Sequence, residues 1–344
     1  MSVSSVARSP YRRLARTCGT RPAVTEQTPV DPSLHEIASI QDAIEDIRAG
    51  RMVILVDDED RENEGDLVVA AEHLTAEQVN FMAREGRGLI CLALDSERAD
   101  ALGLEPMARQ NTAPLGTAFT ISIDLADGSG IGAQGRVATM KHALKADAHR
   151  DDFVSPGHVF PLRARPGGVL VRSGQTEGSV DLARLAGLEP AGVICEIMRG
   201  DGTMARLTEL LAFGAEHDIK VVTVADLIRY RLQNERLVEC VGDARLPTQF
   251  GEFTLRCYQN VLSGQVHLAL TMGEFHGDDS TLVRVHRSDV ISDVFGLDFI
   301  QSRSRLAWSL QRMAEEGAGV LLYLRPEGGH EQLADRIARY SAMA

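Results

Sequence analysis

Along residues 40–235, short continuous apolar runs alternate with segments whose apolar residues recur every three or four positions. The runs at 52–56 and 191–196 are short and rich in Val and Ile, and this pattern predicts buried strands. The apolar positions between Ile40 and Ile47 have helical spacing and end at Gly50, which predicts a helix. By the same rules we expect strands at 67–71, 88–94, 119–124 and 220–223, and helices that follow the capping box at Thr75, span 137–146 and 207–215, and end near Gln233. This alternation predicts an α/β layered domain.

A second pattern begins near Val238. Apolar residues at helical spacing predict a helix at 304–316, and the apolar run at 319–324 predicts a strand after it. A length of 344 residues leaves room for about two domains. We therefore expect a second, smaller α/β domain in this part of the chain.

Residues 57–66 follow the apolar run at 52–56 and read DDEDRENEGD, of which seven are acidic. Carboxylates crowded at the end of a buried strand repel one another unless a cation, a basic side chain or solvent offsets their charge. Hard divalent cations prefer oxygen ligands, and magnesium is usually held by one or two carboxylates together with substrate oxygens. The segment is therefore either a solvated acidic loop or part of a cation site.

Charge and cysteine usage narrow the classes of function. A formal net charge of −13 argues against a general nucleic-acid-binding surface, so an anionic substrate would need a local cluster of basic side chains. No apolar stretch approaches the roughly 18 residues of a membrane span. The five cysteines form no CxxC pair, and Cys91 and Cys195 lie in apolar runs, where a free cysteine behaves as a small core residue. This usage fits a reducing compartment.

The order of residues in 57–66 resembles the DDEDRENEGD signature of the 3,4-dihydroxy-2-butanone 4-phosphate synthase family of riboflavin biosynthesis, with identity at all ten positions. The resemblance covers roughly residues 37–235 and continues through GLIC (88–91), NT (111–112), GT (116–117), PGHVFPLR (156–163), PAGVICE (190–196) and DGTMAR (201–206). It implies an α/β fold, a three-layer α/β/α sandwich on a mixed sheet, in a homodimer that uses Mg²⁺ or Mn²⁺.

The resemblance also implies a reaction, the conversion of D-ribulose 5-phosphate to 3,4-dihydroxy-2-butanone 4-phosphate and formate. Excision of one carbon by enolisation and rearrangement needs a base near a carbon acid and a cation that stabilises an enediolate. It also needs a group for later proton transfers and an anchor for the phosphate.

The acidic segment supplies three of the implied site residues. Glu62 matches the magnesium-ligating glutamate of the family and also a substrate contact. Arg61 and Asp66 match substrate-contacting positions. Asp66 is a candidate for gripping or deprotonating a sugar hydroxyl.

The implied acid/base groups and phosphate anchor come from other segments. His158 matches the catalytic histidine, and histidine exchanges protons near neutral pH. Glu196 matches a catalytic and substrate-contacting glutamate, and its place at the end of a buried strand suits general acid/base chemistry. The family's R-x-G-H-T segment, an arginine, a turn and a hydroxyl at the start of a helix that together form a phosphate cradle, is matched by Arg172, Ser173, Gly174, Gln175 and Thr176.

The chain departs from the family at three site positions. Gln175 replaces the magnesium-binding histidine, and its amide oxygen is a donor that a hard cation accepts, so we expect weaker metal binding rather than none. The family's G-[IV]-S-A-x-D-R segment is here 130–136, with Gly132 in place of the hydroxyl and Gly135 in place of the carboxylate. The missing acid is either part of the chemistry or a structural partner of Arg136.

The second part of the chain resembles the start of GTP cyclohydrolase II, a domain often fused behind the synthase. Its matching segments are RLPT (245–248), GEF (251–253), VRVH (283–286) and DVFG (293–296). The resemblance implies three zinc-binding cysteines, but the matching positions hold Asp289, Ile300 and Ser302. Tetrahedral zinc needs about four ligands and His286 alone is insufficient, so we expect neither zinc nor GTP ring opening. The family's E-G-R-G-I-G-L motif survives only as 327–331, and the chain ends before most of the catalytic half.

The first 34 residues differ from the rest, because five arginines precede the first acidic residue, Glu26, and Ser and Thr are frequent. This composition is typical of an organellar transit peptide, although Pro10 and Pro22 interrupt any amphipathic helix. We interpret 1–34 as a disordered tail or the product of an early start codon. We therefore expect a cytoplasmic protein, with an organelle as the alternative, and place the domains at 35–236 and 237–344.

Two functions compete. The first is a magnesium-dependent lyase that binds D-ribulose 5-phosphate, with no nucleic-acid or membrane partner. The second is a catalytically impaired scaffold or regulatory paralogue, which the changes at 132, 135 and 175 favour. The acidic segment and His158 favour the enzyme.

Overall fold

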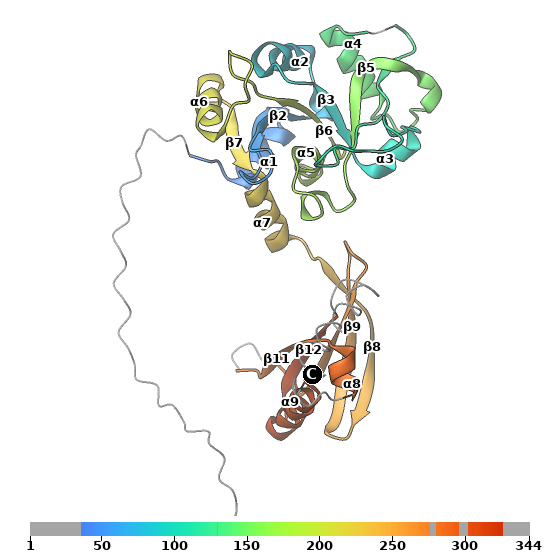
Figure 1. The fold of residues 1–344 in the computed structure, drawn as a ribbon, viewed down its shortest axis with the longest axis vertical. Helices are drawn as coiled ribbons and strands as arrows, with labels where there is room; N and C mark the ends of the chain where they lie inside the picture. Colours follow the sequence, from blue (N-terminus) through green and yellow to red (C-terminus); the bar gives the residue numbers. More distant parts are fainter. Residues whose placement is uncertain (1–35, 129, 276–279, 296–301, 326–344) are drawn as a thin grey trace, which may run out of the picture. The chain divides into compact units, whose positions relative to one another are not determined.

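The computed structural model describes residues 36–128, 130–275, 280–295 and 302–325, so the predicted tail lies outside the described residues. Two β-sheets organise this part of the chain (Figure 1). The strands of the first sheet are β1 (Val53–Val56), β2 (Gly65–Ala70), β3 (Cys91–Leu94), β4 (Ile123–Leu125), β5 (Phe153–Arg163), β6 (Ala191–Glu196) and β7 (Lys220–Thr223). They lie in the order β4-β5-β3-β6-β2-β1-β7 and mix parallel with antiparallel pairs, as the resemblance implied.

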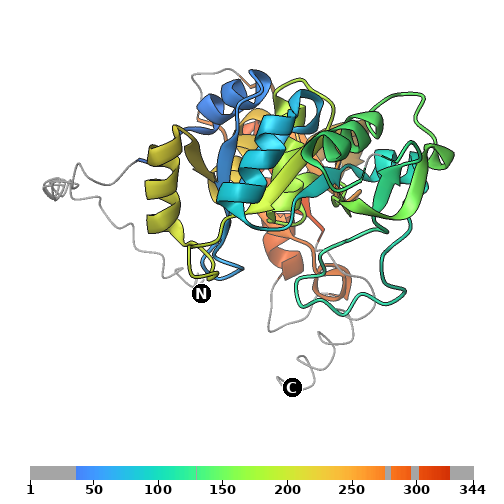
Figure 2. The ribbon, with the colours of Figure 1, turned by 90° about the horizontal axis from the view of Figure 1, so that it is seen from above.

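Helices cover both faces of the first sheet. They are α1 (Ile40–Arg48), α2 (Ala76–Phe81), α3 (Ser96–Ala101), α4 (Ala133–His142), α5 (Gln175–Leu185), α6 (Leu207–His217) and α7 (Val224–Asn234). Successive side chains of a strand point to opposite faces, so Ile54 packs with α2, α4 and α6, whereas Leu55 packs with α1, α5 and α7. Figure 2 shows α6, α2 and α4 across one face. The predicted three-layer α/β/α sandwich is confirmed.

Several boundaries in the structure differ from the predicted ones, because strand pairing and helix capping, rather than the local apolar pattern, decide where elements begin and end. β6 and β7 have the predicted bounds, but β2 begins at Gly65, so Asp66 is inside a strand. β3 begins at Cys91 rather than 88, and α4 begins at Ala133 rather than 137. The predicted strand at 119–124 is wrong in extent, since β4 covers Ile123–Leu125 and Phe119 makes only an isolated bridge.

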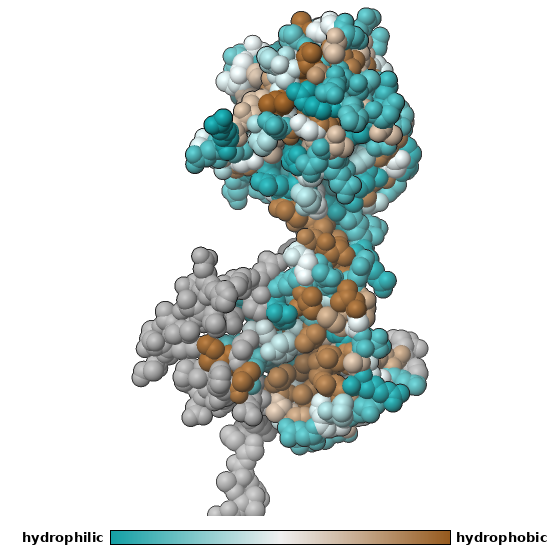
Figure 3. All heavy atoms as spheres, turned by 90° about the vertical axis from the view of Figure 1, so that its right-hand side faces the viewer, coloured by the Kyte–Doolittle hydropathy of each residue, from teal (hydrophilic) through white to brown (hydrophobic). Residues whose placement is uncertain are grey.

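The second sheet contains β8 (Val238–Thr248), β9 (Gly251–Asn260), β10 (Val266–Met272), β11 (Val283–Arg287) and β12 (Gly319–Leu324), in the order β11-β12-β10-β9-β8. Two helices, α8 (Val290–Phe295) and α9 (Ser302–Glu316), accompany it. The predicted helix at 304–316 and strand at 319–324 are confirmed, and Met313 and Leu321 are buried together with Phe253. Figure 3 shows brown, hydrophobic side chains gathered on the surface of this part of the chain.

Within the described ranges, no helix combines the length and the apolar character needed to cross a bilayer.

A buried ion pair ties α7 to α5. Arg231 on α7 and Asp181 on α5 have side chains that are 2% and 3% exposed, and Arg231 Nη1 lies 2.6 Å from Asp181 Oδ2. The same nitrogen donates to the carbonyl of Gly167 at 2.8 Å, and Asp181 Oδ2 accepts from the backbone N–H of Val169. The pair therefore also holds the segment that leads into Arg172.

Replacing Arg231 by alanine should destabilise the protein by about 3 kcal/mol, because it removes the buried cation beside the Asp181 carboxylate and leaves that carboxylate only the half-exposed Arg184. Arg229→Ala on the same helix is the matched control. Arg229 pairs with Asp226 but is 66% exposed, so its removal should cost at most about 1 kcal/mol. Urea unfolding of both variants measures the difference, and equal free energies of unfolding would contradict the structural role of the buried pair.

Candidate active site

The acidic loop joins β1 to β2 and is organised by the buried carboxylate of Asp57. Asp57 Oδ1 accepts a hydrogen bond from the backbone N–H of Glu64 at 2.8 Å. Its Oδ2 accepts from the backbone N–H of Glu62 at 3.2 Å and from Arg61 Nη1 at 2.6 Å. Arg206 Nη1 donates to the carbonyl of Glu62 at 2.8 Å. A buried carboxylate and a guanidinium thus fix the backbone that presents Glu62.

Three oxygens converge on one nitrogen of Arg61. Besides Asp57, Arg61 Nη1 donates to Glu62 Oε2 at 2.6 Å and to Gln175 Oε1 at 2.8 Å. The amide of Gln175 donates in turn to the carbonyl of Glu64 at 3.4 Å. The predicted metal ligands, Glu62 and Gln175, are therefore brought together although 113 positions separate them in the sequence, and both oxygens already face a positive charge.

Asp66 and Glu196 are paired residues of the neighbouring strands β2 and β6. Asp66 is 4% exposed, and this burial raises the pKa of its carboxyl well above the usual value. The negative charges of Glu196 and of the acidic loop raise that pKa further. Glu196 Oε2 accepts from the backbone N–H of Leu89 at 2.8 Å. A Cβ on Gly88 would lie 2.5 Å from this carboxylate, so the approach needs glycine.

The predicted phosphate cradle lies at the start of α5. Gly174 is the N-cap residue and makes no side-chain cap, and an uncapped helix N-terminus offers N–H donors and a partial positive charge to an anion. A Cβ on Gly174 would lie 2.5 Å from Arg172 Nη1 and 3.0 Å from Arg61 Nη2, so both guanidiniums meet over this residue. Glu177, fully buried, accepts from Arg172 Nη1 at 2.6 Å and holds that side chain in place.

His158 projects from β5 and contacts Asp124 on β4. Its Nδ1 lies 2.6 Å from Asp124 Oδ2, and its backbone N–H donates to Asp124 Oδ1 at 3.0 Å. The His158 side chain is 51% exposed, whereas that of Asp124 is 9% exposed. Within the described residues, His158 makes no hydrogen bond to the acidic loop.

The two glycine departures lie at the start of α4. Gly132 is its N-cap residue without a side-chain cap, and Gly135 lies in the first turn. Arg136, the next residue, has a buried Nε that finds no hydrogen-bond partner among the described residues, and burial lowers the pKa of its guanidinium. This unpaired atom favours the interpretation that the family's acid at 135 is a structural partner of Arg136.

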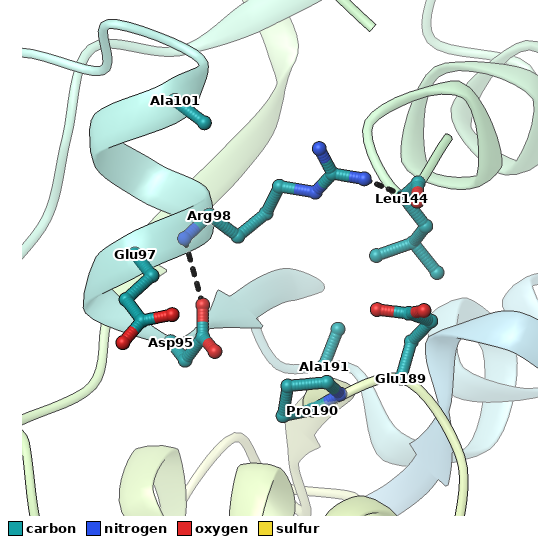
Figure 4. Close-up of a pocket in the computed structure, with 8 residues that line it drawn as sticks. All are labelled: Asp95, Glu97, Arg98, Ala101, Leu144, Glu189, Pro190 and Ala191. Atoms are coloured by element: carbon teal, nitrogen blue, oxygen red, sulfur yellow. Dashed lines mark hydrogen bonds between the residues drawn. The ribbon is translucent and has the colours of Figure 1, made fainter. Parts of the chain in front are cut away.

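Sequence reasoning missed four residues that hold the predicted ones in place: Asp57, Asp124, Glu177 and Arg206. Asp57 and Arg206 lie inside matched motifs that gave them no role, whereas Asp124 and Glu177 lie outside the matched motifs. Each contacts a residue that a motif identified. A cavity of about 260 Å³ lies between α3 and the segment 189–191. Figure 4 shows the residues that line it. None of the predicted site residues lines it, so it is not part of this site.

Asp66→Asn should stabilise the free protein at neutral pH. Since the folded-state pKa of Asp66 is raised, the folded protein binds more protons than the unfolded chain above about pH 3.8, and its stability falls as pH rises through the folded-state pKa. The asparagine side chain does not ionise, so the variant lacks this pH-dependent loss of stability. Unfolding in the absence of divalent cations should show a gain for the variant at about pH 8 that shrinks toward about pH 4. A gain independent of pH would contradict the linkage.

Comparison with known proteins identifies the family of this chain. The family model for 3,4-dihydroxy-2-butanone 4-phosphate synthase matches residues 41–230, and that for GTP cyclohydrolase II matches residues 239–344. The riboflavin biosynthesis protein RibBA of Aquifex aeolicus is 54% identical over 307 residues, which cover 88% of this chain and 76% of the relative. A 3,4-dihydroxy-2-butanone 4-phosphate synthase of Pseudomonas syringae is 49% identical over 87% of this chain and 82% of the relative.

Solved structures give the same result. The two-domain 3,4-dihydroxy-2-butanone 4-phosphate synthase RibBX of A. baumannii is 43% identical, with a TM-score of 0.68 over 85% of this chain and 83% of that one. A synthase solved in complex with two magnesium ions is 41% identical, with a TM-score of 0.55 over 57% of this chain and 98% of that one. The chain therefore belongs to the 3,4-dihydroxy-2-butanone 4-phosphate synthase family.

Proposed function

We propose that this protein converts D-ribulose 5-phosphate to 3,4-dihydroxy-2-butanone 4-phosphate and formate in riboflavin biosynthesis. The proposal rests on the way that three distant segments form one polar site. The acidic loop contacts the start of α5 through Arg61 and Gln175, and it meets the end of β6 where Asp66 pairs with Glu196. These segments contain the oxygen donors for a cation, two carboxyl groups for proton transfer and the arginine of the phosphate anchor, which the reaction needs.

We propose that Glu62 and Gln175 hold Mg²⁺ or Mn²⁺. Their oxygens are hard donors that already converge on one cationic nitrogen, so the donor set fits a hard divalent ion. The magnesium complex of a synthase that is 41% identical supports the choice of metal. When bound, such an ion holds vicinal sugar oxygens and stabilises negative charge on them.

The remaining residues bind substrate and move protons. Arg172, the N-terminus of α5 and the hydroxyl of Thr176 bind the phosphate, with Ser173 and Gly174 forming the turn. The carboxyl of Asp66 exchanges a proton at a sugar hydroxyl, since its raised pKa makes it a better base than an ordinary aspartate. Glu196 and His158 Nε2 carry the later proton transfers. Arg61 completes the site between the metal oxygens and the phosphate cradle.

Glu62→Gln should lower formate release by at least about 100-fold at low magnesium, because even changing groups that only support a ligand costs about 10–100-fold. Glu59→Gln is the matched control, since Glu59 lies on the same loop and is exposed. Gln175→His should lower the magnesium concentration that half-saturates the rate. Titrating magnesium against formate release from ribulose 5-phosphate measures all three variants.

Wild-type turnover in Glu62→Gln would remove this residue from the metal site. No formate from the unmodified protein at saturating magnesium would instead favour the scaffold, which the altered residues at 132, 135 and 175 also permit.

We also propose that the second part of the chain neither binds zinc nor opens the ring of GTP. Asp289 and Ser302 replace two of the family's soft thiolate ligands. The third position, Ile300, and the motif remnant at 327–331 lie outside the described residues. His286 Nε2 forms a hydrogen bond with Asp293 Oδ1 at 3.0 Å, so this ring nitrogen is already engaged. Elemental analysis should find no stoichiometric zinc, and formate released from GTP would contradict the proposal.

The assembly and location are part of the same proposal. We place the domains at 35–236 and 237–344 and expect a homodimer in the cytoplasm. Cys91 and Cys195 are buried free thiols, as the sequence predicted, and burial raises the pKa of Cys195 to about 12. Such unreactive thiols fit a reducing compartment. An Arabidopsis relative is named chloroplastic, so an organelle stays the alternative.

A further inference from the structure

The register between β4 and β5 contains an irregularity that presents His158. Ile123 pairs with Val159, but the next residue of β4, Asp124, pairs with Val154. Two consecutive residues of β4 thus face residues of β5 that are five positions apart. Residues 155–158 leave the ladder and form a bulge opposite Asp124. Bulges of this kind re-aim a side chain, and here the side chain is that of His158.

Backbone contacts hold the bulge against β4. The backbone N–H of Gly157 donates to Ser122 Oγ at 3.1 Å. A Cβ on Gly157 would lie 2.0 Å from the carbonyl carbon of Ile123 and 2.3 Å from the backbone nitrogen of Asp124, so only glycine allows this approach. On the other side of Asp124, the N–H of Leu125 donates to the buried Thr139 Oγ1 at 3.1 Å. Asp124 therefore sits at a fixed point of the fold.

The carboxylate of Asp124 binds His158 twice, once at the backbone and once at the ring. An ionised carboxylate only accepts hydrogen bonds, so the proton of this contact is on Nδ1 of the imidazole. The other ring nitrogen, Nε2, then carries the free lone pair. Because the ring is half exposed while Asp124 is buried, Nε2 is the nitrogen available to a substrate.

We propose that Asp124 is a positioning residue for His158, which fixes its Nδ1–H tautomer and its ring orientation so that Nε2 accepts and returns the proton. The inference rests on the proposed function, in which His158 transfers protons. The contact of Asp124 with Nδ1 of His158 follows a general rule, in which the hydrogen-bond partner of one ring nitrogen decides the role of the other nitrogen.

Asp124→Asn in the full chain tests the inference, because asparagine keeps the shape but places an NH₂ group against one of the two donors of His158. We expect kcat for formate release to fall by at least about 100-fold, within the range of general acid/base catalysis, with KM for ribulose 5-phosphate changed by less than about threefold. In ¹⁵N spectra of histidine-labelled protein, the His158 signal should move from the Nδ1–H toward the Nε2–H tautomer.

Asp152→Asn is the matched control. Asp152 Oδ2 also accepts from a backbone N–H, that of His149 at 2.9 Å, and also contacts an imidazole, His142 Nε2 at 2.9 Å, but none of these residues belongs to the site. This variant should keep wild-type kcat and leave the His158 signal unchanged.

His158→Gln tests the proton-transfer role of His158 separately from the positioning role of Asp124. The signal that disappears in this variant is that of His158. Wild-type turnover in His158→Gln would overturn the role of His158 in the proposed function. An inactive His158→Gln together with a fully active Asp124→Asn would overturn the positioning role alone. If Asp124→Asn does not fold, the unmodified protein decides, since an Nε2–H tautomer of His158 there would overturn the inference.

Discussion

Repulsion among the carboxylates that gather where β1, β2 and β6 meet is the constraint on which the rest of the site depends. The fold answers it in two ways. Arg61 and Arg206 place guanidiniums against the loop, and the interior carboxylate of Asp57 is used as a hydrogen-bond acceptor for the loop backbone. Asp66 is buried, and within the described residues it has no guanidinium partner of this kind. Burial and the neighbouring carboxylates therefore raise its pKa. The crowding that costs stability thus also raises the pKa of the carboxyl that we propose exchanges a proton with the substrate.

Helix α5 extends the same principle to the phosphate cradle. A helix that packs on a sheet normally buries an apolar face. Helix α5 also buries two acidic residues, Glu177 and Asp181. Each carboxylate holds part of the segment before the helix, Glu177 through Arg172 and the N–H of Arg165, and Asp181 through the N–H of Val169. The helix therefore fixes Arg172 beside its own N-terminus, where we propose that the phosphate binds.

Motifs identified the residues for which we propose contact with a substrate, but they gave no role to the residues that hold them in place. Glu62, Asp66, His158, Glu196 and residues 172–176 could be found because their order matches a family. Asp57 belonged to the same signature, yet nothing in that signature separates a buried scaffold carboxylate from an exposed one. Asp124 lies in an ordinary strand segment, 34 positions before its histidine, and only the bulge in β5 makes it a partner.

The sequence by itself determined the layers of the first domain, most of its strands and helices, and the segments that carry chemistry, because periodicity and motif order are local properties of the chain. Tertiary structure decided where β2 begins, since its pairing with β6 draws Asp66 out of the loop. It also decided that the amide oxygen of Gln175 faces Arg61. Such contacts join residues more than 100 positions apart, and only the assembled sheet brings them within hydrogen-bond distance.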